Sequence, residues 1–120
     1  MALLAICIPI TAGKTEQFQR FVDELNGPRH ADFEAARRAL NMRERTFLQS
    51  GPEGNMIIVT LEGDDPETAL GSFGDARDEF TDWFVAQVKE CHGIDLRSAL
   101  PGQLPRMIAD SRHSERLISI

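Results

Sequence analysis

The sequence is poor in the residues from which disulfide-rich and metal-binding proteins are built. It contains two cysteines, Cys7 and Cys91, and three histidines that are scattered at no metal-ligand spacing. Two isolated cysteines do not form a disulfide framework, so we expect both to be reduced, buried thiols of a cytoplasmic protein. Zinc sites need histidines and cysteines at short, regular spacings. We therefore expect neither a metal nor another cofactor.

Basic residues are scarce as well. The chain has 13 Lys and Arg against 19 Asp and Glu, which gives a formal net charge of -6. Phosphate backbones and anionic membranes are bound by basic surfaces, so this balance excludes nucleic acid and a membrane as partners. No apolar run reaches the length of a membrane span. The apolar residues 3–10 follow no Lys or Arg and precede no small-residue cleavage site, which predicts a strand rather than a signal peptide.

The apolar residues that are present suffice for one core. The chain has 120 residues, of which 42% are hydrophobic. We predict one domain, residues 1–96, followed by an extended C-terminal arm, residues 97–120. Two prolines in the arm exclude regular helix, and residues 106–110 or 117–120 are candidates for a last strand.

The order of the hydrophobic patterns predicts the fold. Residues 3–10 form an apolar run, residues 18–25 carry an apolar stripe at helical spacing, two strand-like runs flank a turn at residues 51–54, and a second helical pattern ends at Gly93. The order strand, helix, strand, strand, helix is that of the split β-α-β unit, so we predict an α+β, ferredoxin-like domain. Its sheet is antiparallel, with both helical regions on one face. Glycines and a proline divide each helical region in two, at residues 26–28 and near residues 71–74.

The two strands of the hairpin can be placed in register from the loop between them. If residues 51–54 form a four-residue loop, Ser50 pairs with Asn55, and Phe47 lies opposite Ile58. The sheet face that carries Phe47 and Ile58 mixes apolar and polar side chains and is too apolar to be left in water. We therefore expect this face to be covered by a second copy of the chain in a homodimer.

Two arginines on the same face differ in their expected partners. In this register Arg43 lies opposite Glu62, which predicts an ordinary cross-strand ion pair. Arg45 lies opposite Thr60 and has no such partner. Arg45 is therefore the better candidate for binding an anion.

Several short segments of the chain resemble a known family. They are GKTEQF at residues 13–18, GPR at 27–29, FTDWF at 80–84 and HGIDL at 92–96, followed by Pro101-Gly102. Together they resemble an uncharacterised bacterial family of the dimeric α+β barrel superfamily, which includes the antibiotic biosynthesis monooxygenases and the haem-degrading monooxygenases. The resemblance covers residues 3–112 and implies a homodimer in which two ferredoxin-like sheets pack face to face. The segments define helices and turns rather than a catalytic signature, so the resemblance implies a fold rather than an activity.

The named activities of that superfamily need residues that this chain lacks. Haem-degrading relatives use an Asn on the first strand with a Trp and a His on the second helical region, and residues 3–10 contain no Asn. Trp83 and His92 are nine positions apart, which at about 100° per residue places them on opposite sides of one helix. Quinone-forming relatives often use a Tyr, and this chain has none. Neither activity is expected.

Five residues are candidates for ligand binding, and no catalytic residue can be named. The candidates are Arg45, His92, Trp83, Arg29 and His30. His92 is either an acid, base or ligand, or a cation that the last helical carbonyls stabilise. Trp83 is either an anchor of the core or interface, or a platform for a cofactor. His30, beside Arg29, lies either at the mouth of a pocket or in solvent at the start of a helix.

Two functions remain open from the sequence. The first is a small-molecule-binding protein that holds a small apolar or anionic ligand between sheet and helices, where a cofactor-independent oxygenase or isomerase activity would also take place. The second is a non-catalytic dimerisation or regulatory module. A cavity that encloses polar groups such as Arg45 and His92 favours the first function, whereas a filled core favours the second.

Overall fold

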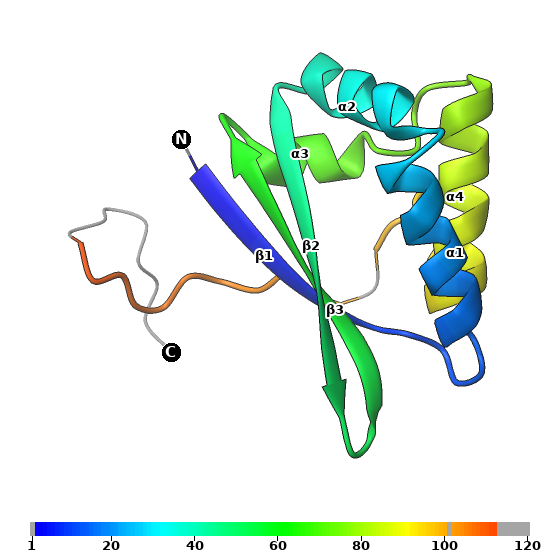
Figure 1. Cartoon of the computed structure of the whole chain (residues 1–120). Helices are drawn as coiled ribbons and strands as arrows, with labels where there is room; N and C mark the ends of the chain where they lie inside the picture. The colour runs from blue at the N-terminus through cyan, green and yellow to red at the C-terminus, as the bar shows by residue number, and fades with distance from the viewer. Residues whose placement is uncertain (1, 101, 113–120) are drawn as a thin grey trace.

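The computed structural model describes residues 2–100 and 102–112. In this part of the chain three strands and four helices follow one another in the predicted order, with each helical region divided in two (Figure 1). The elements are β1 (Ala2–Pro9), α1 (Thr15–Asn26), α2 (His30–Ala39), β2 (Met42–Gly51), β3 (Gly54–Gly63), α3 (Pro66–Gly71) and α4 (Glu79–His92). The protein is therefore an α+β protein, as predicted.

The strands form one antiparallel sheet with β3 in the centre, in the order β1-β3-β2. Ser50 pairs with Asn55 as predicted, and the pairing continues one residue further into the turn, to Gly51 and Gly54. Gly54 has a φ of 124°, a backbone conformation that residues with a side chain rarely adopt. This glycine therefore allows the hairpin to close more tightly than a four-residue loop.

The helices begin and end at local signals that the sequence contains. The Asp65 carboxylate accepts a hydrogen bond from the Thr68 amide at the start of α3, and the Asp78 carboxylate accepts one from the Thr81 amide at 2.7 Å at the start of α4. Gly93 ends α4 in the left-handed conformation, with a φ of 70°. None of the described helices is long and apolar enough to cross a membrane.

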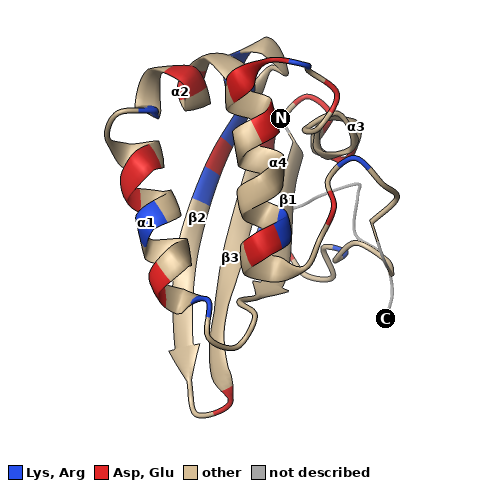
Figure 2. Ribbon diagram, turned by 90° about the vertical axis from the view of Figure 1, so that its right-hand side faces the viewer, with Lys and Arg blue, Asp and Glu red and all other residues tan. Residues whose placement is uncertain are grey.

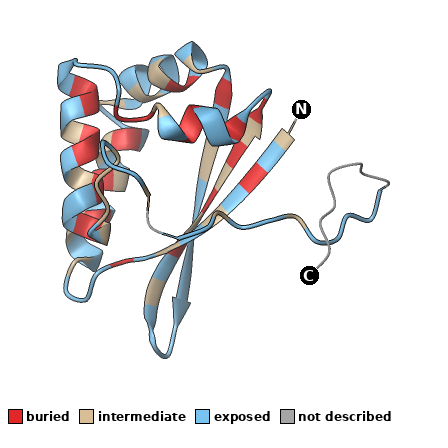
Figure 3. Cartoon of the chain, turned by 180° about the vertical axis from the view of Figure 1, so that it is seen from behind, coloured by how far each residue is buried: buried red, intermediate tan, exposed pale blue. Residues whose placement is uncertain are grey.

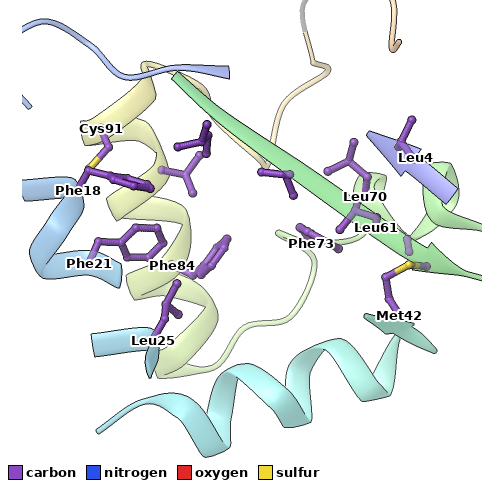
Figure 4. Packing of buried hydrophobic residues seen from close by; sticks show 14 of the residues in the cluster. Leu4, Phe18, Phe21, Leu25, Met42, Leu61, Leu70, Phe73, Phe84 and Cys91 are labelled. Carbon is purple, nitrogen blue, oxygen red and sulfur yellow. The ribbon is translucent and has the colours of Figure 1, made fainter. Parts of the chain in front are cut away.

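The apolar core lies between the inner face of the sheet and the helices. Figure 4 shows its labelled residues in two groups: Phe18, Phe21, Leu25, Phe84 and Cys91 on α1 and α4, and Leu4, Met42, Leu61, Leu70 and Phe73 on the sheet, on α3 and just after α3. The helices α1 and α4 thus pack mainly on each other, whereas α3 packs directly on β1 and β3.

The outer face of the sheet is left open by the described part of the chain (Figure 3). Leu3, Phe47 and Met56 are large apolar side chains exposed there, and Phe47 keeps 55% of its surface accessible. Cys7 is exposed on the same face, so the expectation that it is buried was wrong. Side chains alternate along β1, and Cys7 points to the side that the helices do not cover. Cys91 is buried, as expected.

The C-terminal arm leaves the domain in an extended path past β1 (Figure 1). Leu100 and Leu104 pack against the core, and further along the arm Met107 forms a groove with Leu3. Residues 102–112 contain no strand, so the last strand expected at residues 106–110 was wrong. Pro105 offers no backbone N–H to a ladder with β1, and here the arm and β1 line a groove together. The other candidate, residues 117–120, lies outside the described residues.

Candidate functional site

A cavity of about 540 Å³ lies between the inner face of the sheet and the helices α1, α2 and α4. It exists because the aromatic rings of the helices pack on one another rather than on the middle of the sheet. The ring centroids of Phe21 and Phe84 are 5.3 Å apart, and Phe33 stacks on Phe84 at 6.2 Å. Helix α3 fills only one end of the space under the sheet.

The walls of the cavity are mainly apolar. One wall is formed by Ile6, Ile8, Ile57 and Val59 of the sheet, and the facing wall includes Phe18 and Phe21 of α1. The volume falls within the range of about 300–1,000 Å³ that small-molecule sites occupy in proteins. The space is therefore large enough, and apolar enough, to hold a small organic molecule.

The mouth of the cavity lies between β2 and α1. The exposed residues that line it are Gln19, Asn26, His30, Thr46, Phe47 and Leu48. His30 thus occupies both of the positions considered for it, because it is exposed near the start of α2 and also borders the mouth. A polar rim around an apolar interior is typical of ligand pockets.

His92 lines the cavity at the end closer to the β2–β3 turn. Its Nδ1 lies 2.9 Å from the carbonyl oxygen of Pro9, and since that oxygen only accepts, Nδ1 carries the hydrogen. In the neutral ring Nε2 then keeps its lone pair. Burial lowers the pKa of His92 below its ordinary value of 6.5, against the hydrogen bond to Pro9, which raises it. The lowered pKa disfavours a cationic helix cap, and a neutral imidazole of this kind can act as a base.

Glu44 supplies a second polar group, at the other end of the cavity. Its carboxylate accepts a hydrogen bond from Nε of Arg37 at 2.6 Å, and each of the two side chains is only 7% exposed. The Arg37 guanidinium lies over the rings of Phe73 and Phe84, at 3.8 and 4.7 Å from their centroids. Glu44 lines the cavity, whereas Arg37 lies behind the cavity wall.

Arg45 borders the mouth, but it is not the unpaired cation that the register predicted. Its Nη2 lies 3.3 Å from Glu62, so the cross-strand ion pair that was expected for Arg43 forms with Arg45 instead. Arg43 and Glu62 are opposite each other, as predicted. Diagonal neighbours on a sheet are still within reach of a long side chain, which explains the exchange of partners.

Arg29 and Trp83 lie together away from the cavity. The Arg29 guanidinium is 4.2 Å from the Trp83 ring centroid and donates two hydrogen bonds to Glu79, at 2.7 and 2.8 Å. Trp83 also packs against Phe21 and Phe80. These contacts fasten the junction of α1 and α2 to the start of α4, so Trp83 is an anchor of the core.

The sequence interpretation missed Arg37 and Glu44. A signal for Glu44 was present, because strand alternation places it in the same row as Met42 and Thr46, which face the helices. A charged residue in a row that faces the core needs a buried partner. Nothing in the linear sequence identified Arg37 as that partner, since the pairing depends on how α2 lies against β2.

Comparisons with known proteins add no family to this description. No family model matches the chain, and neither a curated protein nor a solved structure matches it. Among residues 2–100 and 102–112, no three His, Cys, Asp or Glu side chains are grouped closely enough to hold a metal ion. The cavity and its polar groups are therefore the basis for inferring a function.

Proposed function

We propose that the protein binds a small, mainly apolar molecule in the cavity between the sheet and the helices. The observation that supports this most directly is a volume of about 540 Å³ with apolar walls and the polar groups Glu44 and His92 among its lining residues. Cores that serve packing alone are filled nearly as densely as organic crystals, and empty space in them costs stability. The cavity therefore favours a binding protein over a non-catalytic dimerisation or regulatory module.

The charges around the cavity favour an uncharged ligand over an anionic one. The expectation of an anionic ligand rested on an unpaired Arg45, but Arg45 is paired with Glu62. Inside the cavity Glu44 would repel a ligand carboxylate, and its own counter-ion, Arg37, lies behind the wall. The free-energy cost of burying a second carboxylate there would exceed the free energy gained from the apolar contacts of a small ligand.

If the bound molecule is a substrate, His92 is the residue that would act in catalysis. Cofactor-independent oxygenases and isomerases begin by removing a proton from the substrate, and a neutral imidazole with a free lone pair is suited to that step. His92 has its Nδ1 hydrogen engaged by Pro9 and a pKa that burial lowers, which together support Nε2 as the base. Binding is the primary proposal and proton removal the second.

We also propose that the domain is ferredoxin-like and forms a homodimer through the outer face of its sheet. The order β1-β3-β2 with antiparallel pairing is what a ferredoxin-like sheet shows when its last strand is missing. A second copy that covers the exposed Phe47 would bury the apolar surface of this face.

The binding proposal is tested with the uncharged fluorescent dye N-phenylnaphthylamine. We expect one dye molecule to bind per chain, with an increase in fluorescence on transfer to an apolar site. Val22→Trp places an indole in the cavity from α1 and should weaken dye binding about tenfold or more. Ala86→Trp, which adds the same ring to an exposed position of α4, is the matched control and should leave the affinity unchanged.

The outcome separates the two functions. Stoichiometric binding that Val22→Trp weakens about tenfold or more supports the small-molecule site. Binding that both tryptophan variants leave intact would place the dye elsewhere, on the open face of the sheet, and would contradict the proposal. An absence of binding by the natural chain would favour the non-catalytic module.

A further inference from the structure

We infer that Glu44 determines which ligand the cavity accepts, and that it selects a hydroxyl group, of an alcohol or a phenol, on an otherwise apolar molecule. The inference deepens the proposed function, on which it rests, because it names the ligand class of the same cavity. It is argued from the direction of the Glu44 side chain, its partner and the groups that surround the pair.

The position of Glu44 is set by the alternation of β2. Arg43 and Arg45 lie on the outer face, whereas Glu44 lies on the inner face, in register with Leu61, which is fully buried. Figure 2 shows this blue, red and blue sequence on β2, which is visible between the ribbons of α1 and α4 in that view. The single acidic residue of the three is thus the one directed toward the cavity.

Packing alone does not require an ion pair at this place. A buried pair of charges is often no more stabilising than two apolar side chains of the same volume, because both ions lose their hydration. The neighbours of the pair are aromatic, and an apolar pair would fit among them. Glu44 lines an open cavity rather than filled core, so a bound molecule would lie beside its side chain.

Arg37 acts as a positioning residue for Glu44. Its guanidinium is held among the rings of Phe73, Phe84 and Phe33, at 3.8, 4.7 and 5.3 Å from their centroids. Because the rings hold the flat guanidinium in place, the guanidinium in turn holds the Glu44 carboxylate that it binds. The bond from Nε occupies Oε1 of Glu44, and a carboxylate has room for several further donors.

The pair is also incompletely satisfied. Nη2 of Arg37 is buried and has no hydrogen-bond partner in the described part of the chain. This donor is buried by the chain itself and Arg37 does not line the cavity, so a molecule in the cavity would meet Glu44 rather than Arg37. Glu44, with Arg37 behind it, therefore forms a polar corner of an apolar space.

The charge balance of this corner decides which polar group fits. Arg37 already neutralises Glu44, so a ligand ammonium would bring a positive charge that nothing nearby balances. A ligand carboxylate would bring a second negative charge beside Glu44. A hydroxyl donates one hydrogen bond to the carboxylate without any net charge, and its desolvation cost is the smallest of the three.

The inference is tested with four molecules that share one alkyl chain and differ in their head groups: decanol, decyl methyl ether, decylamine and decanoate. Each competes with N-phenylnaphthylamine for the natural chain. The ether keeps the oxygen of the alcohol but cannot donate, so it isolates the hydrogen bond to Glu44. We expect decanol to bind about tenfold more tightly than the ether, which is the effect of one buried hydrogen bond to a charged group. Decylamine and decanoate should bind more weakly than decanol.

The variant Arg37→Met/Glu44→Leu replaces the pair by apolar side chains of similar volume and should fold, as buried ion pairs replaced in this way usually do. We expect it to bind the dye as before and to bind decanol and the ether equally. Glu44→Gln, whose amide can donate a hydrogen bond to the ether, should also reduce the difference in affinity between decanol and the ether. The readout is the ratio of two affinities, because a loss of folded protein lowers both to the same extent.

The outcomes distinguish a failure of the inference from a failure of the proposed function. If the natural chain binds the dye but does not distinguish decanol from the ether, the inference about Glu44 is wrong while the proposed function stands. If the double variant keeps the preference for decanol, Glu44 is not its source and the inference is again wrong. If the natural chain does not bind the dye at all, the proposed function fails, and the inference fails with it.

Discussion

Two ionisable side chains lie in the cavity wall, and the protein accommodates them by different means. Glu44 keeps its carboxylate beside the buried guanidinium of Arg37. His92 has no charged partner of this kind and is bonded to a backbone carbonyl, and burial lowers its pKa. Pro9, whose carbonyl oxygen binds His92, pairs with Met56 of β3, whereas Glu44 pairs with Leu61, five positions further along that strand, or about 16 Å along the strand. An elongated apolar molecule could therefore meet one polar group at each end.

We predict that His92 makes the folded protein less stable as the pH falls below 6.5. Because its pKa is lowered in the folded state from 6.5, the unfolded chain binds a proton that the folded chain does not. Stability is therefore fully present above pH 6.5 and falls as the pH decreases from 6.5 toward the folded-state pKa. Urea unfolding at several pH values will measure this slope, and His92→Gln should remove it.

The control for this prediction is His30→Gln, which changes an exposed histidine at the mouth of the cavity. The slope of stability against pH below 6.5 should persist in that variant. A slope that is the same in the natural chain and in His92→Gln would show that other groups cause it. The position of the His92 ring in the cavity would then have no consequence for proton binding.

At the scale of the elements, the sequence correctly predicts those features of the strands and helices that a local rule determines. The register of the hairpin follows from the side-chain period of two and from the turn, so the pairing of Ser50 with Asn55 could be predicted. The breaks within each helical region follow from glycine and proline. The partner of Glu62 could not be predicted, because the choice between Arg43 and Arg45 depends on the reach of side chains along one face.

The start of α4 is an element whose stability can be tested directly. The Asp78 carboxylate accepts a hydrogen bond from the Thr81 amide, and this bond lowers the pKa of Asp78 below 3.8. We predict that Asp78→Ala lowers the free energy of unfolding by about 1 kcal/mol at neutral pH, the usual effect of removing a helix cap. Asp78→Asn, which keeps an acceptor oxygen, should lose much less.

The decrease in the free energy of unfolding caused by Asp78→Ala should also depend on pH. A carboxyl group whose pKa is lowered by folding stabilises the protein above its ordinary pKa, and this contribution disappears as the pH falls through the folded-state value. The difference between the natural chain and Asp78→Ala should therefore shrink in acid. Chemical unfolding monitored by circular dichroism measures both effects, with Asp75→Ala, an exposed aspartate of the preceding loop, as the matched control. Equal losses for Asp78→Ala and Asp75→Ala would contradict the capping role.

At the scale of the whole molecule, two apolar surfaces have no counterpart in the described chain. One is the wall of the cavity, which the sequence could not predict because its size depends on how far the helices stand from the sheet. That distance is set by rings such as Phe21 and Phe84, which are remote in sequence and meet only in the folded chain. The other is the outer face of the sheet, which the hairpin register did predict. A bound molecule would cover the first surface and a second copy the second.

We predict that the protein is a homodimer in solution and that Ile58→Asp separates it. Ile58 lies at the centre of the outer face, in register with Cys7 on one side and Phe47 on the other. A carboxylate there would be buried without a partner in the dimer but would be solvated in the monomer, so the substitution favours the monomer. Light scattering should give twice the chain mass of 13.4 kDa for the natural protein and the single mass for Ile58→Asp. Ala35→Asp, on the exposed side of α2, is the matched control and should remain dimeric, since it adds the same charge away from the sheet. A monomer mass for the natural chain at micromolar concentration would show that the outer face is not an interface between copies. A dimer that persists in Ile58→Asp would show that the interface lies elsewhere.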